Sequence, residues 1–104
     1  MKNMISCGQT AENFSLIESS TNLMKIISEP NRIKILCILS CENICVCNLA
    51  EMVGLTQNLV SHHLKVMQEG GILDKERKGN QLFYFIKPHM KEKVTKLFEF
   101  INII

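Results

Sequence analysis

The chain has 104 residues, of which 46% are hydrophobic and 21% charged, and its formal net charge is +2. This length supports one hydrophobic core and excludes a second one, and the composition is that of a folded globular protein rather than a disordered one. No apolar run reaches the length of a membrane span, and the N-terminal residues lack the apolar segment of a signal peptide, so we expect a cytoplasmic protein.

Positive charge is concentrated in the C-terminal part of the chain. Residues 1–64 carry four basic and five acidic side chains, a net charge of −1, whereas residues 65–104 carry eight and five, a net charge of +3. This excess indicates contact with phosphate groups, although a solvated face would look much the same.

Two helices are predicted in the first third of the chain. A loose apolar stripe indicates a helix over residues 11–27, with a break at the polar run 18–22. Pro30 then stands where proline is tolerated, in the opening turn of a second helix, directly after the capping candidate Glu29. Because residues 33–39 are apolar on nearly all sides, we expect this second helix to be largely buried.

A pair of short helices follows a polar break at residues 40–43. The first runs from residue 44 or 45 to Val53 and ends at Gly54, the residue best suited to a left-handed cap. Thr56 offers an N-cap hydroxyl to the next helix. The apolar positions of that helix are predicted to share one face and are Leu59, Val60, Leu64 and Met67. A tight turn between two such helices is a helix-turn-helix.

The rest of the chain predicts a hairpin and a final helix. Residues 72–77 and 81–86 read as two strands joined by a glycine turn. Pro88 opens the last helix, whose apolar residues repeat at helical spacing at Met90, Val94, Leu97, Phe98 and Ile101. So much apolar surface in a small domain indicates that this helix is partly buried against a second subunit.

These elements predict a winged helix-turn-helix, a mostly α member of the α+β class with a two-stranded β-hairpin as its wing. We expect a single domain that dimerises through its N- and C-terminal helices. Its parts are a flexible arm at residues 1–10, the helix-turn-helix at 44–70, the wing at 72–86 and a dimerisation helix at 88–104.

The second helix of the helix-turn-helix carries side chains suited to reading double-stranded DNA. Off its apolar face lie Gln57, Asn58, Ser61, His62 and Lys65. Amides, hydroxyls and amines bond to base edges in the major groove, so the first four are predicted base contacts and Lys65 a phosphate contact. His63 lies nearer the apolar side and is predicted to be packed. At the hairpin tip, Arg77, Lys78 and Asn80 could reach phosphates or the minor groove.

Three segments carry a resemblance to a known family. LMKIISEPNRIKIL at residues 23–36, ICVCNLA at 44–50 and VSHHLKV at 60–66 resemble the arsenical-resistance (ArsR-type) family of bacterial metal-responsive repressors. The resemblance implies a homodimer that binds operator DNA when free of metal and releases it when a thiophilic ion binds.

Cys45 and Cys47 are the first candidate ligands, because thiolates select soft ions such as As(III), Pb(II), Cd(II) and Zn(II). On a regular helix two residues at i and i+2 point about 200° apart, since each residue turns about 100°. The pair can chelate one ion only if Cys45 precedes the helix or its first turn is distorted. Binding would then pull on the helix that supports the DNA reader.

A third ligand is required, and the candidates are Cys7 and Cys41. In the cadmium- and lead-sensing branch that the chain resembles, the arm of one subunit supplies thiolates to the CVC pair of the other, which implies Cys7. The chain has one arm cysteine, and it has Ala50 where the arsenic-sensing branch places its third cysteine. A three-sulfur set suits As(III) or Pb(II). Cys37, in an apolar run, is predicted to pack as a small hydrophobe.

The zinc site of another branch is predicted to be absent. That branch uses Asp and His near the start of the terminal helix, where this chain has Lys87 and His89, and a further His at a position that falls near Phe100.

Two other functions are compatible with the cysteines. One is a repressor of the same fold that responds to thiol oxidation or persulfides. The other is a small metal-binding or trafficking module, against which stand the VSHHLKV segment and the basic hairpin beside the thiols. An enzyme is not expected, because CxC differs from the CxxC redox motif and no βαβ pattern surrounds it.

Overall fold

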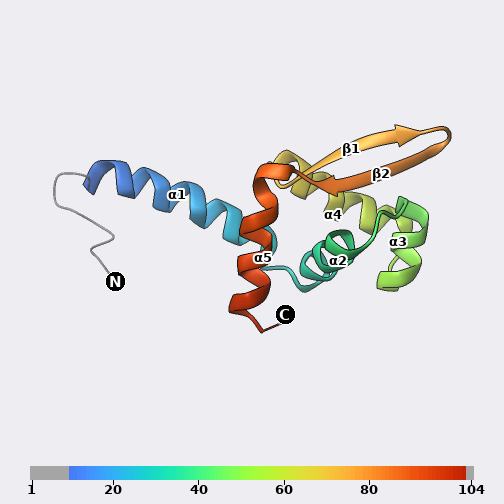
Figure 1. Ribbon diagram of the computed structural model, residues 1–104, viewed down its shortest axis with the longest axis horizontal. Helices are drawn as coiled ribbons and strands as arrows, with labels where there is room; N and C mark the ends of the chain where they lie inside the picture. The colour runs from blue at the N-terminus through green and yellow to red at the C-terminus, as the bar shows by residue number, and fades with distance from the viewer. Residues whose placement is uncertain (1–9, 103–104) are drawn as a thin grey trace.

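The computed structural model describes residues 10–102, and its helices enclose one core with a hairpin at the edge (Figure 1). The elements in chain order are α1 (Thr10–Ile27), α2 (Pro30–Cys41), α3 (Val46–Val53), α4 (Gln57–Glu69), β1 (Leu73–Lys78), β2 (Gln81–Ile86), the 3₁₀ turn η2 (Pro88–Met90) and α5 (Lys91–Phe100). No helix among these residues is long and apolar enough to cross a membrane. The winged helix-turn-helix fold is confirmed.

The first helix lacks the break that was predicted for it. It is unbroken across the polar run at residues 18–22, and it extends away from the body, so the described part of the chain is 52 Å long and only 26 Å wide (Figure 1). Only the C-terminal end of α1 reaches the core, through Leu23, Ile26 and Ile27. Gly70 permits this contact, because a Cβ there would lie 2.5 Å from Ile26 Cδ1.

The core forms between α2, α4 and the inner face of the hairpin. Fully buried side chains from these elements and from the turn before β1 meet there, and they are Ile35, Leu36, Val60, Leu64, Met67, Ile72 and Leu73. Leu49 of α3 and Val94 and Phe98 of α5 complete it. The second helix is less enclosed than predicted, since Ile33, Cys37, Ile38 and Leu39 are only half-buried.

The second helix also runs two residues longer than expected. Ser40 and Cys41 were assigned to a polar break, but both are helical, and the Ser40 hydroxyl donates to the Cys37 carbonyl at 2.8 Å. A serine in the last turn of a helix can therefore satisfy a backbone carbonyl that has no partner within the helix. The start is as predicted, since the Glu29 carboxylate accepts from the backbone N–H of Asn31 at 2.8 Å.

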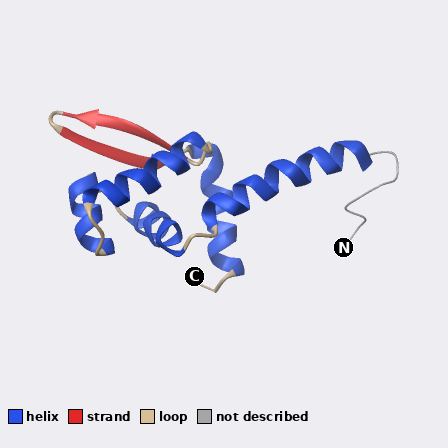
Figure 2. Cartoon of the chain, turned by 180° about the vertical axis from the view of Figure 1, so that it is seen from behind, coloured by secondary structure: helices blue, strands red, loops and turns tan. Residues whose placement is uncertain are grey.

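The hairpin is a two-stranded antiparallel ribbon that extends beyond the helices (Figure 2). Its register pairs Leu73 with Ile86 at the base and Lys78 with Gln81 at the tip. Tyr84 and Ile86 face the core, whereas Phe85 on the other face is 37% exposed. Successive side chains of β2 therefore alternate between a face buried against the core and a face exposed to solvent.

The final helix begins later than predicted, and the end of its apolar stripe is exposed in the single chain. Pro88 opens a 3₁₀ turn, and α5 proper begins at Lys91. Val94 and Phe98 are buried, but Ile101 lies past the end of the helix and is 38% exposed.

Candidate functional site

The recognition helix α4 presents a polar surface to solvent. Gly54 at φ 79° ends α3, and Thr56 Oγ1 accepts from the Leu59 backbone N–H at 3.2 Å, so both predicted caps of the turn are present. All five predicted DNA contacts on this helix are exposed, namely Gln57, Asn58, Ser61, His62 and Lys65. The N-terminal turn that carries Gln57 and Asn58 is therefore free to enter a major groove.

Leu59 lies outside the buried face of this helix, so the prediction that places it on the apolar face is wrong. Val60, Leu64 and Met67 are fully buried, but Leu59 is 42% exposed. Its position is about 100° around the helix from Val60, which places it at the margin of the buried stripe.

His63 is buried, as predicted, and it also has two polar partners that the sequence does not predict. Its Nε2 lies 3.1 Å from Glu29 Oε2, and its Nδ1 accepts a hydrogen bond from Arg32 Nε at 3.1 Å. Arg32 in turn donates from Nη1 to the Ile26 carbonyl at 2.9 Å. These bonds tie the recognition helix to the junction of α1 and α2.

The charge state of His63 follows from this environment. Burial lowers the pKa of His63, Arg32 and His62 lower it further, and the Glu29 carboxylate opposes them. A neutral imidazole is also what the geometry requires, because Nδ1 must keep its lone pair to accept from Arg32.

The wing carries its basic side chains at the tip. Arg77, Lys78 and Asn80 are all exposed, and Gly79 at φ 63° makes the turn. The Lys78 ammonium does not simply extend into solvent, because its Nζ lies 5.3 Å from the centroid of the Phe83 ring. This distance is typical of a cation–π contact.

Cys45 and Cys47 lie at the start of α3 with their sulfur atoms 2.9 Å apart. Cys45 is the N-cap residue, with extended backbone angles of φ −78° and ψ 163°, so it precedes the first helical turn. The condition stated above for chelation by an i, i+2 pair is therefore met. Cys45 is 4% exposed and Cys47 is exposed to solvent.

The two thiols differ in acidity. A hydrogen bond with Cys47 lowers the pKa of Cys45, and the backbone N–H of Asn48 lowers it further, whereas burial acts in the opposite direction. The same hydrogen bond raises the pKa of Cys47, because Cys47 keeps the shared proton. The first thiolate of the pair thus forms at the positive end of α3, where an anion is stabilised.

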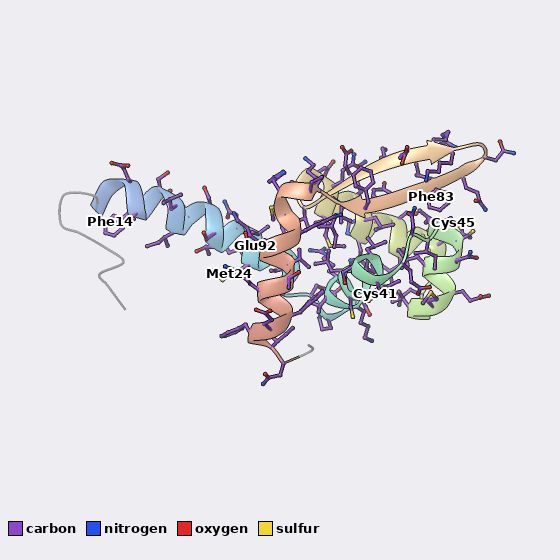
Figure 3. All side chains as sticks on the ribbon, viewed as in Figure 1. Phe14, Met24, Cys41, Cys45, Phe83 and Glu92 are labelled. Atoms are coloured by element: carbon purple, nitrogen blue, oxygen red, sulfur yellow. The ribbon has the colours of Figure 1, made fainter. Side chains whose placement is uncertain are left out.

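The third ligand is not part of this arrangement. Cys7 lies outside the described residues. Cys41 is exposed at the end of α2, and Figure 3 places it apart from Cys45. Within residues 10–102, no three side chains of His, Cys, Asp or Glu are grouped to hold a metal ion. Cys37 is half-buried against the core, and His89 is exposed beside α5.

A capped recognition helix, a supporting helix and a basic β-hairpin define the class of winged-helix DNA-binding regulators. Residues 29–75 match the family described as bacterial regulatory protein, arsR family. This chain belongs to the ArsR family of transcriptional regulators, and it is a DNA-binding regulator rather than an enzyme.

Similar proteins agree with this assignment. The arsenical resistance operon repressor of Escherichia coli is 30% identical over 78 residues, which cover 74% of this chain and 67% of that protein. The cadmium resistance transcriptional regulatory protein CadC of Listeria innocua is 36% identical over 70 residues, which cover 66% of this chain and 59% of that protein. The crystal structure of the transcriptional repressor BigR from Xylella fastidiosa superposes with a TM-score of 0.79 at 25% identity, covering 90% of this chain and 94% of that one.

Proposed function

We propose that this chain is a metal- or metalloid-responsive repressor that leaves its operator when a thiophilic ion binds Cys45 and Cys47. The observation that carries the proposal is the pair of sulfur atoms 2.9 Å apart at the N-cap of α3. Two thiolates bound to one ion at about 2.3 Å each must lie within about 4.6 Å of one another, and these already do. The names of the arsenical and cadmium resistance relatives support the same reading.

The location of the pair supports an effect on DNA. Helix α3 is joined to the recognition helix only by the short turn at residues 54–56, and Leu49 and Val60 belong to one core. An ion held by both sulfurs would fix the first turn of α3, and a shift of that turn would be passed to α4 by direct packing.

We propose Cys7 as the third ligand, supplied by the arm of the partner subunit, with Cys41 as the alternative. Three thiolates favour As(III) or Pb(II) over Cd(II) and Zn(II), which prefer four ligands. The DNA contacts of this proposal are those of the exposed surface described above, on α4 and at the wing tip.

The partner would be a second copy of the chain. Apolar side chains are exposed along α1 and at the end of α5, namely Phe14 (60%), Leu16 (64%), Ile17 (51%), Met24 (57%) and Phe100 (84%). Figure 3 shows Phe14 far from the body, where no other element among residues 10–102 covers it. A symmetric dimer through α1 and α5 would bury these side chains.

The test is DNA binding by the reduced protein in the presence of ions. A labelled duplex is first selected from a random pool with ion-free protein, and its fluorescence anisotropy is then titrated with arsenite, Cd(II) and Zn(II). We expect arsenite to release the wild type but neither Cys45→Ser nor Cys47→Ser, and Cys7→Ser to need more arsenite. Cys37→Ser is the matched control and should behave as the wild type.

Two outcomes would reject the proposal. One is that none of the three ions releases DNA from the reduced protein, and the other is that the Cys45 and Cys47 variants respond as the wild type does. A repressor controlled by thiol oxidation is the second candidate, because sulfurs in contact, one of them with a lowered pKa, are also suited to oxidation. Release by a thiol oxidant alone, reversed by reductant, would favour it.

A further inference from the structure

A backbone bridge joins the thiol pair to the wing. Cys45 pairs antiparallel with Phe83, in the middle of β2 and 38 positions later in the sequence. The extended conformation of Cys45 makes this possible, because a helical residue could not pair with a strand. Figure 3 shows Cys45 and Phe83 next to each other. Cys45 therefore caps α3, contributes one sulfur of the thiol pair and pairs with the edge of the hairpin.

The side chain of Phe83 continues the connection to the basic tip. In the hairpin register Phe83 lies opposite Glu76, and Lys78 lies opposite Gln81, so Phe83 and Lys78 are diagonal neighbours on one face. The Lys78 ammonium is held over the half-buried Phe83 ring at 5.3 Å. A contact of this kind on an exposed surface is weak enough to be exchanged for a DNA phosphate.

We propose that Phe83 is a positioning residue that couples the thiol pair to the wing, an inference that rests on the proposed function. A change in the backbone of Cys45 must shift or break its pairing with Phe83, and a shift of β2 moves the ring on which Lys78 rests. The wing then has two arrangements, one with the Lys78 ammonium on the Phe83 ring and one with it on a DNA phosphate. Whether Cys45 and Cys47 hold an ion selects between the two arrangements. This route to DNA is separate from the packing of α3 on α4.

The same strand contains a matched control. Phe85 lies two residues further on the same face of β2, opposite Asp74, and is more exposed than Phe83. Among the described residues, the isolated bridge and the cation–π contact both fall on Phe83. Phe83→Leu and Phe85→Leu make the same chemical change, and only the first removes the ring beneath Lys78.

The experiment measures DNA affinity with and without arsenite for the full-length wild type, Phe83→Leu, Phe85→Leu and Phe83→Tyr. The quantity compared is the ratio of the two dissociation constants, which for allosteric proteins is typically about 5 to 150. We expect this ratio to fall to about a third or less of the wild-type value in Phe83→Leu, and to stay unchanged in Phe85→Leu and Phe83→Tyr. Ion affinity, measured by thiolate-to-metal charge-transfer absorption, should remain within about twofold for all four.

A double-mutant cycle tests the route, since coupling pathways require such evidence. Lys78→Met should reduce the ratio of dissociation constants as Phe83→Leu does. In the double variant this ratio should fall no further than in either single variant. If Phe83→Leu does not fold, as judged by circular dichroism, the ratio in Lys78→Met is the test: a reduced ratio supports the inference and an unchanged ratio overturns it. An unchanged ratio in the folded Phe83→Leu protein, or an equal loss in Phe85→Leu, overturns the inference and leaves the proposed function intact. Failure of arsenite to release the wild type rejects both.

Discussion

The hydrogen bonds of His63 allow a prediction about stability that follows from their lengths and from the exposure of the partner side chains. His63→Ala removes the bond from Arg32 and the contact with Glu29, both at 3.1 Å. A hydrogen bond contributes about 1 kcal/mol net, or about 1.5–3 kcal/mol with a charged partner. Because the Glu29 side chain is 33% exposed and Arg32 only half-buried, water can replace part of the loss. We therefore expect the free energy of unfolding to fall by about 2–3 kcal/mol.

His63→Gln separates these bonds from the titration of the imidazole. Glutamine can accept from Arg32 through its carbonyl oxygen and donate to Glu29 through its amide, so we expect a loss below that of His63→Ala. Urea unfolding monitored by circular dichroism, at fixed protein concentration, measures both variants. Equal losses would show that packing of the ring, and not its hydrogen bonds, holds the helix.

The same residue makes stability depend on pH. The pKa of folded His63 lies below the ordinary value of 6.5, so below pH 6.5 the unfolded chain binds a proton that the folded chain does not. The free energy of unfolding should then fall with decreasing pH, by at most about 1.4 kcal/mol per pH unit, until the folded pKa is reached. His63→Gln lacks this contribution, and an equally steep fall in that variant would refute the reasoning.

Two further predictions concern the core and the wing. Leu36→Ala, at a fully buried position, should lower the free energy of unfolding by about 2–5 kcal/mol, whereas Leu59→Ala, at a 42% exposed one, should change it by less than about 0.5 kcal/mol. Urea unfolding compares them, and similar losses would contradict the exposure of Leu59. Lys78→Ala should weaken binding to all duplex sequences alike and reduce the slope of log affinity against log salt by about one. A changed preference at a single base pair would contradict its assignment to phosphate.

Local chemistry explains why most of the fold could be predicted. The caps at Glu29, Gly54 and Thr56 act within a few residues, so the sequence itself carries the start of α2, the end of α3 and the start of α4. The hairpin is predictable for the same reason, because its glycine turn lies between two strands of matching length. The length of α2 was missed because Ser40 was read as a loop residue, although its hydroxyl can also satisfy a helical carbonyl.

Contacts between distant residues explain what the sequence did not predict. His63 and Arg32 are 31 positions apart, and no periodicity relates an imidazole on α4 to a guanidinium at the start of α2. The pairing of Cys45 with Phe83 is likewise long-range. For the cysteines, spacing defined the condition for chelation, but whether Cys45 precedes the helix depends on the backbone at a single residue.

The extended position of α1 would couple folding of this helix to the proposed dimerisation. Between Glu12 and Asn22 every side chain except the half-buried Asn13 is exposed, and the core contacts of this helix begin at Leu23. An isolated helix of this length is marginal in water, so a second subunit packed on α1 would stabilise its outer half. In the dimer that we propose, dilution would melt part of α1 as the subunits separate. The abundance of the protein in the cell would then set both how much dimer exists and how much of each chain is folded.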